Sequence, residues 1–253
     1  MKIDRNLQGN GTPLRAWHAS RRLDSVAPIS AAELVGEHQR AVIVAPHPDD
    51  EVLGCGGLLQ RLVGLKRRLM LISVTDGSAA YPGSLRWSAE RLSIIRPQES
   101  TEALRRLGVP LNETQWIHGG FPDSAVAAHE ARLVQFLGTY LQPSDVLFTP
   151  WRGDGHTDHE AVARACVAAA RAVGASVHEV PIWAWHWAQP EDQRLPWERA
   201  RKLELDLWTQ ARKRHAIQAF ASQTQGDPER GIEPILSPIV LERLQQSFEV
   251  IFL

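Results

Sequence analysis

The stretch Ala41-Val-Ile-Val-Ala45-Pro46-His47-Pro48-Asp49-Asp50-Glu51 joins a short apolar run to a cluster of histidine and acidic residues. A β-branched apolar run of this length is typical of a buried strand. The residues from Glu51 to about Leu65 then have the apolar periodicity of a helix. In an open α/β sheet, such a strand-to-helix turn lies at the carboxyl edge, where ligands bind.

The rest of the chain repeats this alternation of strand and helix. We predict further strands at 69–75, 115–118 and 145–149, and helices at 90–107, 130–141 and 159–173. Strands alternating with helices at this spacing favour an α/β fold of three layers, with a mostly parallel sheet and helices on both faces. The part after Pro181 is Trp-rich, with a charged helix expected near 197–220 and a last strand at 248–253.

The organisation we predict is an N-terminal arm, residues 1–40, followed by one domain, residues 41–253. Within that domain, 41–175 form the core and 176–253 a C-terminal elaboration. The arm is expected to be irregular, with a short amphipathic piece around 30–37.

The composition restricts the class of protein. The chain has 253 residues, with 28 Lys and Arg against 29 Asp and Glu, a balance that argues against a nucleic-acid or membrane-surface binder. Cys55 and Cys166 are too few for a disulfide scaffold, which suggests two core thiols in a reducing compartment. Residues 1–22 lack the apolar segment of a signal peptide, and no run approaches a membrane span. We therefore expect a cytoplasmic protein.

A second polar cluster, His156-Thr157-Asp158-His159, follows the strand predicted at 145–149 and also begins a helix. If both strands belong to one parallel sheet, the two clusters meet at one edge. An imidazole and a carboxylate three residues apart, with a distant imidazole, match the ligands of a catalytic zinc site with an open position for water. A further carboxylate beside them would act as general base.

Helix capping is the structural alternative. Thr157 and Glu160 have capping-box spacing, and either Asp49 or Asp50 could cap its helix. Capping does not explain three histidines in the same two turns, so we favour a metal or catalytic site.

These two clusters, with Val52-Leu-Gly-Cys-Gly-Gly57 after the first, closely resemble the motifs of the PIG-L (LmbE-like) family. Members of that family are zinc-dependent deacetylases acting on N-acetylglucosaminyl (GlcNAc) groups. The resemblance covers much of residues 41–175 and implies a Rossmann-like fold. It also implies one Zn²⁺ per chain, although Fe²⁺ or Co²⁺ would accept the same ligands.

Matched by motif position, the resemblance makes His47, Asp50 and His159 the zinc ligands and Asp49 the general base. His156 would stabilise the tetrahedral oxyanion and could protonate the leaving amine. The implied reaction is zinc-assisted hydrolysis of the acetamide.

Two further residues are weaker candidates for substrate contacts. Arg96 lies three residues before Glu99 on a predicted helix, which by itself indicates a surface ion pair; the family often has Arg and Glu at this spacing. Asp123 lies in a turn, where Asp usually bonds its own backbone, but family members often place Asp here near the sugar hydroxyls.

The tryptophans raise a separate question. The alternation Trp183-x-Trp185-x-Trp187 would place three indoles on one face of an extended segment, and we favour core packing over a sugar-stacking surface.

The function we predict is removal of the acetyl group from a small GlcNAc-containing molecule. The alternatives are a metal-dependent hydrolase with another substrate or product, such as a non-sugar amidase, a non-catalytic sugar-binding module, or a structural or regulatory family member. The aglycone and the oligomeric state are left open.

Overall fold

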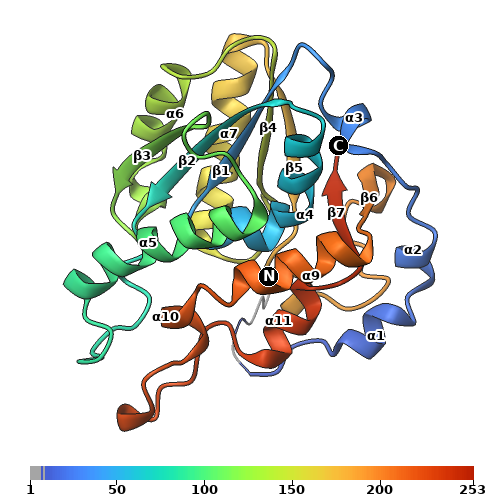
Figure 1. The fold of residues 1–253 in the computed structure, drawn as a ribbon. Coiled ribbons are helices and arrows are strands. Elements are labelled where there is room, and N and C mark those ends of the chain that lie inside the picture. Colours follow the sequence, from blue (N-terminus) through green and yellow to red (C-terminus); the bar gives the residue numbers. More distant parts are fainter. Residues whose placement is uncertain (1–6, 8) are drawn as a thin grey trace.

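The computed structural model describes residue 7 and residues 9–253; residues 1–6 and 8 of the predicted arm lie outside the described part. One mixed sheet runs through the molecule in the order β3-β2-β1-β4-β5-β7-β6 (Figure 1). Its strands are β1 (Arg40–Ala45), β2 (Arg68–Thr75), β3 (Gln115–Phe121), β4 (Asp145–Pro150), β5 (Ser176–Val180), β6 (Ala200–Glu204) and β7 (Phe248–Phe252). The strands β3, β2, β1, β4 and β5 are parallel, whereas β7 is antiparallel to both of its neighbours.

Helices cover both faces of this sheet (Figure 1). The helices α4 (Asp50–Gly64), α5 (Ala89–Leu107) and α9 (Leu207–Ile217) lie on one face, and α6 (Glu130–Gly138) and α7 (Thr157–Val173) lie on the other. The alternation of side chains along β1 fills both layers, because Ala41 and Ile43 belong to the core with α4 whereas Val42 and Val44 belong to the core with α7. The predicted three-layer α/β fold is confirmed.

The strand β1 lies between β2 and β4, at the point where the sheet's connections diverge. After β1 the chain crosses through α4 to β2, and after β4 it crosses through α7 to β5 on the opposite side. Such a switch point opens a crevice at the carboxyl ends of the two strands. Both polar clusters of the sequence follow these strand ends.

Smaller elements complete the fold. They are the short helices α1 (Leu14–His18), α2 (Arg21–Asp24), α3 (Ala31–Leu34), α8 (Ala184–Trp187), α10 (Ala221–Thr224) and α11 (Pro238–Leu244), and the 3₁₀ turns η1 (Val126–His129), η2 (Trp197–Arg199) and η3 (Pro228–Arg230). The N-terminal helices pack on the C-terminal elaboration, where the Trp17 indole donates to the Trp185 carbonyl at 3.0 Å. Of the helices in the described residues, none has the length and apolar character needed to cross a membrane.

Two local predictions were wrong. The expected charged helix near 197–220 contains the strand β6 in its first part, because Ala200 and Leu203 are buried beside β7 while charged neighbours lie along the sheet edge. The Trp-rich segment is not extended, since residues 184–187 form the single-turn helix α8.

The glycines of α4 have a packing role. A side chain at Gly57 would collide with Leu205, and one at Gly54 would lie 3.0 Å from Val180. They allow the C-terminal elaboration and the sheet to approach α4 closely.

Candidate metal centre

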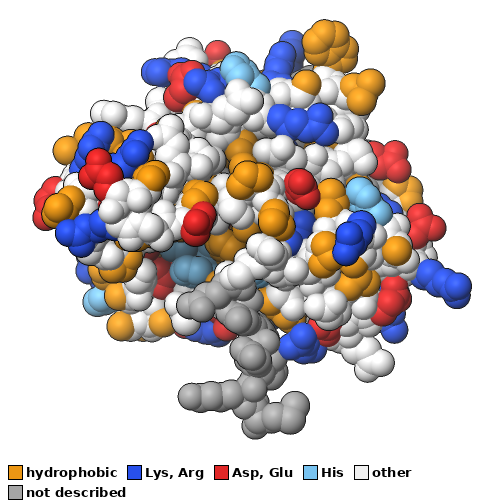
Figure 2. Space-filling view, turned by 90° about the horizontal axis from the view of Figure 1, so that it is seen from below, with side chains coloured by type: hydrophobic (Ala, Val, Ile, Leu, Met, Phe, Trp, Pro, Cys, Tyr) orange, Lys and Arg blue, Asp and Glu red, His pale blue; other side chains and the backbone are white. Residues whose placement is uncertain are grey.

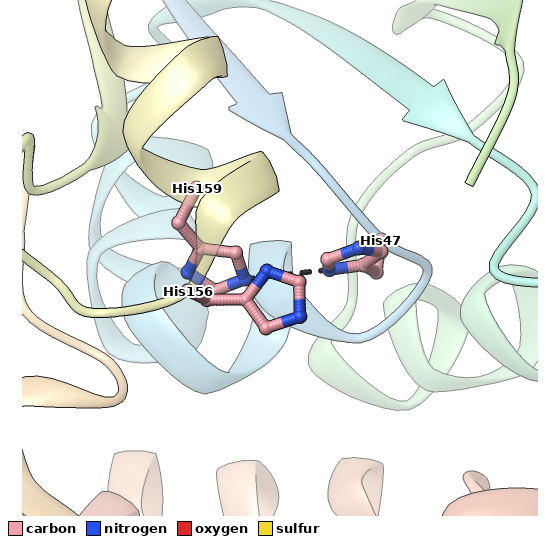
Figure 3. A group of neighbouring side chains, drawn as sticks. All are labelled: His47, His156 and His159. Atoms are coloured by element: carbon pink, nitrogen blue, oxygen red, sulfur yellow. Dashed lines mark hydrogen bonds between the residues drawn. The ribbon is translucent and has the colours of Figure 1, made fainter. Parts of the chain in front are cut away.

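Three side-chain atoms from the two polar clusters form a nearly equilateral triangle. His47 Nδ1 lies 3.2 Å from Asp50 Oδ2, His159 Nε2 lies 3.3 Å from Asp50 Oδ2, and the two ring nitrogens are 3.3 Å apart. Figure 3 shows the imidazoles of His47, from the turn after β1, and His159, from the first turn of α7, directed toward one another. The predicted convergence at the sheet edge is confirmed.

The size of this triangle fits a metal ion. Tetrahedral ligands with bonds of about 2.0–2.1 Å to zinc are separated by about 3.3 Å. One carboxylate and two imidazoles are also the donor types that zinc prefers. These three residues therefore have the separation and chemistry needed to hold a divalent metal.

The outer nitrogen of each imidazole contacts a carboxylate. His159 Nδ1 lies 2.8 Å from Asp154 Oδ2, and His47 Nε2 lies 3.2 Å from Asp123 Oδ1 and 3.4 Å from Asp158 Oδ2. A carboxylate on the far nitrogen is the usual partner of a metal-binding histidine, because it fixes the tautomer that directs a lone pair at the metal.

The electrostatics of the cluster also favour a cation. Burial lowers the pKa of His47, but contacts with Asp123, Asp158 and Asp50 raise it well above its usual range. Burial likewise opposes the charge on His159, yet Asp50 and Asp154 raise its pKa to about 9. The carboxylates thus hold protons on the two imidazoles, and a bound metal ion would replace those protons.

Other groupings of possible ligand atoms occur here within 4.8 Å of one another: His47 with His156 and His159, and His47 with Asp123 and Asp158. The second grouping is the weaker candidate. Both oxygens of Asp158 accept backbone N–H groups, from Ser124 at 2.7 Å and Val126 at 3.2 Å. The Asp158 carboxylate therefore serves to orient His47 and is not a candidate ligand.

Asp49 lies at the start of α4 in a strained backbone conformation, with φ of 150°. Its backbone N–H donates to Glu51 Oε2 at 3.1 Å, and its carboxylate Oδ2 accepts from Arg96 at 3.1 Å. Burial raises the pKa of Asp49 to about 7, while Arg96 opposes that increase. At neutral pH, both the ionised and the protonated forms of Asp49 are thus accessible, so this carboxylate can accept or donate a proton.

His156 caps the helix α7 beside the two histidines of the triangle, His47 and His159. Its Nδ1 accepts from the Asp158 backbone N–H at 3.2 Å, which leaves Nε2 to carry the proton of the neutral ring. Burial, with His159 and His47 nearby, lowers the pKa of His156 to about 3. The residue is therefore suited to donate a hydrogen bond as a neutral group, and poorly suited to protonate an amine.

The expected Arg96–Glu99 surface pair is wrong. Arg96 is 4% exposed, and besides Asp49 it binds the carbonyls of Gly77 at 2.8 Å and Pro48 at 3.1 Å. Glu99 instead accepts from the backbone N–H and hydroxyl of Ser222. The fold buries this face of α5, which the helical spacing alone does not reveal.

A pocket of about 160 Å³ opens beside these groups. Six of the seven predicted site residues line this pocket, together with Trp183, Ile235 and Leu236 among others. The six, which form its polar wall, are His47, Asp49, Asp50, Arg96, Asp123 and His156. Seen from below, the molecule has a recess with histidine and acidic side chains, while basic and acidic groups are interspersed over the surrounding face (Figure 2).

The Trp-rich segment is divided between the pocket and the core. Trp183 lines the pocket, whereas Trp185 and Trp187 are each 8% exposed, in contact with Trp17 and Trp151 respectively. Core packing is therefore correct for two of the three indoles.

The sequence did not identify Asp154, which is fully buried. It lies between two glycines in the loop after β4, where an Asp is typical of an ordinary turn. The roles of Glu51 and Asp158 were also missed, although both belong to the quoted motifs.

Comparison with protein families gives a match over residues 42–170 to the model for PIG-L, GlcNAc-PI de-N-acetylase. Among curated proteins, the chain is 28% identical over 158 residues to the "uncharacterized deacetylase YaiS" of Escherichia coli K12, covering 60% of this chain and 78% of that one. It is 25% identical over 256 residues to a 1D-myo-inositol 2-acetamido-2-deoxy-alpha-D-glucopyranoside deacetylase of Kineococcus radiotolerans, covering 87% of this chain and 66% of the relative.

Among solved structures, a deacetylase from the teicoplanin biosynthesis pathway superposes with a TM-score of 0.63 at 18% identity. The match covers 84% of this chain and 96% of that chain. It supports the same fold for both proteins.

Proposed function

Because this chain belongs to the PIG-L family, we propose that it is a zinc-dependent N-deacetylase acting on a small GlcNAc-containing molecule. The products would be acetate and the free amino sugar. The observation that carries the proposal is the triangle of His47 Nδ1, Asp50 Oδ2 and His159 Nε2, with separations of 3.2–3.3 Å at the switch point of the sheet.

His47, Asp50 and His159 would hold the ion. Bound zinc supplies a Lewis acid for the acetyl carbonyl and lowers the pKa of water to about 7. Three protein ligands leave the further coordination position that such chemistry requires.

Asp49 would accept the proton of the attacking water. Arg96 fixes one oxygen of this carboxylate, and its positive charge stabilises the ionised form that a base requires. The bond to Glu51 holds the strained turn in place, so the base is preorganised at the pocket wall.

His156 would donate from Nε2 to the oxyanion that develops as the carbonyl is attacked. A neutral imidazole fixed by the Asp158 backbone needs no reorientation for this role.

The pocket would bind the sugar between its polar and apolar walls. Trp183 offers an indole on the apolar side, and Asp123 and Arg96 supply polar groups on the other. The family description, GlcNAc-PI de-N-acetylase, supports a GlcNAc-type substrate. So does the name of the Kineococcus relative, a deacetylase of an inositol-linked 2-acetamido-2-deoxyglucoside. A cytoplasmic location is consistent with this proposal and remains a prediction.

A deacetylation screen tests the function. GlcNAc conjugates with inositol, sugar, aryl and lipid aglycones are incubated with zinc-loaded and chelator-treated protein, and acetate and free amine are measured. We expect equimolar acetate and amine from at least one conjugate, with loss on chelation. Release of intact GlcNAc would indicate a glycosidase, and acetate released only from non-sugar amides would indicate an amidase.

A further inference from the structure

We infer that Asp154 is a positioning residue that joins the metal ligand His159 to the apolar wall of the pocket. The inference rests on the proposed metal site. Asp154 follows the end of β4, and its carboxylate is completely buried.

One oxygen of Asp154 serves two groups. Oδ2 accepts from His159 Nδ1 at 2.8 Å and from the Trp183 backbone N–H at 3.0 Å. In the neutral ring that a metal ion would bind, the first contact fixes the proton of His159 on Nδ1, which leaves the lone pair on Nε2 facing Asp50 and His47. The second places Trp183, whose side chain lines the pocket.

The remaining acceptors of Asp154 bind other residues of the segment that carries Trp183. Oδ1 accepts from the backbone N–H groups of Ile182 at 2.8 Å and Ala184 at 3.0 Å. The Asp154 carbonyl accepts from the Trp187 indole at 2.7 Å. The carboxylate thus receives four N–H donors, three of them from consecutive residues of the C-terminal elaboration.

This arrangement requires two acceptor oxygens. In Asp154→Asn, one oxygen is replaced by an NH₂ group that faces two N–H donors, whichever way the amide is turned. If the NH₂ group faces His159, the imidazole gains its hydrogen bond only as the tautomer with the proton on Nε2. That tautomer directs a proton, and no lone pair, at the proposed ion.

Asp145→Asn provides a matched control. Asp145 is also buried, and it accepts from Arg40 Nε at 2.9 Å, Arg40 Nη2 at 2.7 Å and the Gln142 N–H at 2.7 Å. It lies at the opposite end of β4, about 17 Å along the strand from Pro150, the last residue before the loop that carries Asp154. Its substitution removes a comparable buried carboxylate without a contact to the candidate metal centre.

The experiment measures zinc affinity of the full-length wild type and both variants by competition with a chromophoric chelator, together with thermal unfolding of the metal-free proteins. We expect both variants to unfold at lower temperature, but only Asp154→Asn to lose about 10–100-fold in zinc affinity. Zinc affinity of Asp154→Asn within about twofold of wild type, or an equal loss in Asp145→Asn, would overturn the inference. A wild type that binds no zinc would refute the metal site itself.

A second measurement uses the wild type alone and decides the matter if Asp154→Asn does not fold. Nitrogen-15 NMR of the zinc-loaded protein should show His159 bound through Nε2, with a slowly exchanging proton on Nδ1. Binding through Nδ1, or rapid exchange of that proton with solvent, would contradict the assigned role of Asp154.

Discussion

Replacing Asp49 with Asn removes the proposed general base while preserving the shape of the side chain. The Asn oxygen can still accept from Arg96, as Asp49 Oδ2 does at 3.1 Å, and the backbone bond to Glu51 is unaffected. Because the Arg96 guanidinium stays charged, this hydrogen bond remains charge-assisted, and the substitution removes only the negative charge of Asp49, which costs on the order of 1 kcal/mol of stability. The three candidate ligand residues are untouched. We therefore expect a folded protein with its full zinc content.

The rate should fall much more than the stability. A side-chain amide cannot accept the proton of the attacking water, and a positioned base contributes about 10²–10⁴-fold to such reactions. At about 1.36 kcal/mol for each factor of ten, the loss corresponds to about 3–5 kcal/mol of transition-state stabilisation. Most of it should affect kcat, because the variant retains the pocket walls.

The assay compares acetate release at saturating substrate with zinc content from elemental analysis. Asp76→Asn is the matched control: this carboxylate follows the neighbouring strand β2, accepts from the Ser78 N–H at 3.0 Å and lines a separate small cavity. The control should keep wild-type kcat. An Asp49→Asn protein that retains zinc and turns over within about threefold of wild type would refute the assignment of Asp49 as base.

Three further predictions concern the metal, the pocket and the pH dependence of folding. Asp50→Ala removes one corner of the ligand triangle, so zinc content after dialysis should fall below half of the wild-type value; unchanged content would exclude Asp50 as a ligand. Trp183→Ala should raise KM about 2–10-fold with little change in kcat, because this indole lines the pocket. Trp185→Ala should instead lower the unfolding temperature, because this indole is buried. Equal KM values for Trp183→Ala and wild type would argue against a stacking role for Trp183. Burial, assisted by Arg199, lowers the pKa of His178 from 6.5 to about 4, so the unfolded chain binds this proton first as the pH falls. Metal-free protein should thus lose up to about 3 kcal/mol of unfolding free energy between pH 6.5 and pH 4 through this group. Urea unfolding of His178→Gln should show a smaller loss over the same pH range. Identical pH profiles of stability for the variant and the wild type would contradict this assignment.

Much of the fold was predictable because the pattern of apolar residues in β1 is typical only of a buried strand and that in α4 only of a helix. A buried parallel strand is apolar on both faces, and β1 carries Val42 and Ile43 into opposite layers. The edge of the sheet was less predictable. β5 and β6 are five residues each and carry charged side chains, so each shows too few apolar residues to reveal a strand pattern. The segment of β6 was therefore predicted to be helical.

The candidate site was predictable where chemistry is concentrated in adjacent residues. His47 and Asp50 belong to one turn, and His156 and His159 to another, so residue type and spacing suggested a metal site before any geometry. Arg96 gave no such signal, because its partner Asp49 is 47 residues away in the chain.

The sequence by itself determined the layers, the two strand ends that carry polar clusters, and the residue types available for a metal and a base. Local patterns suffice for these features, since strand burial and helix capping depend on near neighbours. The tertiary structure alone decided which atoms meet: the 3.2–3.3 Å triangle, the burial of Arg96 against Asp49, and the position of Asp154 between His159 and Trp183. These contacts join segments that are distant in the chain, and only the crossing connections of the sheet bring them together.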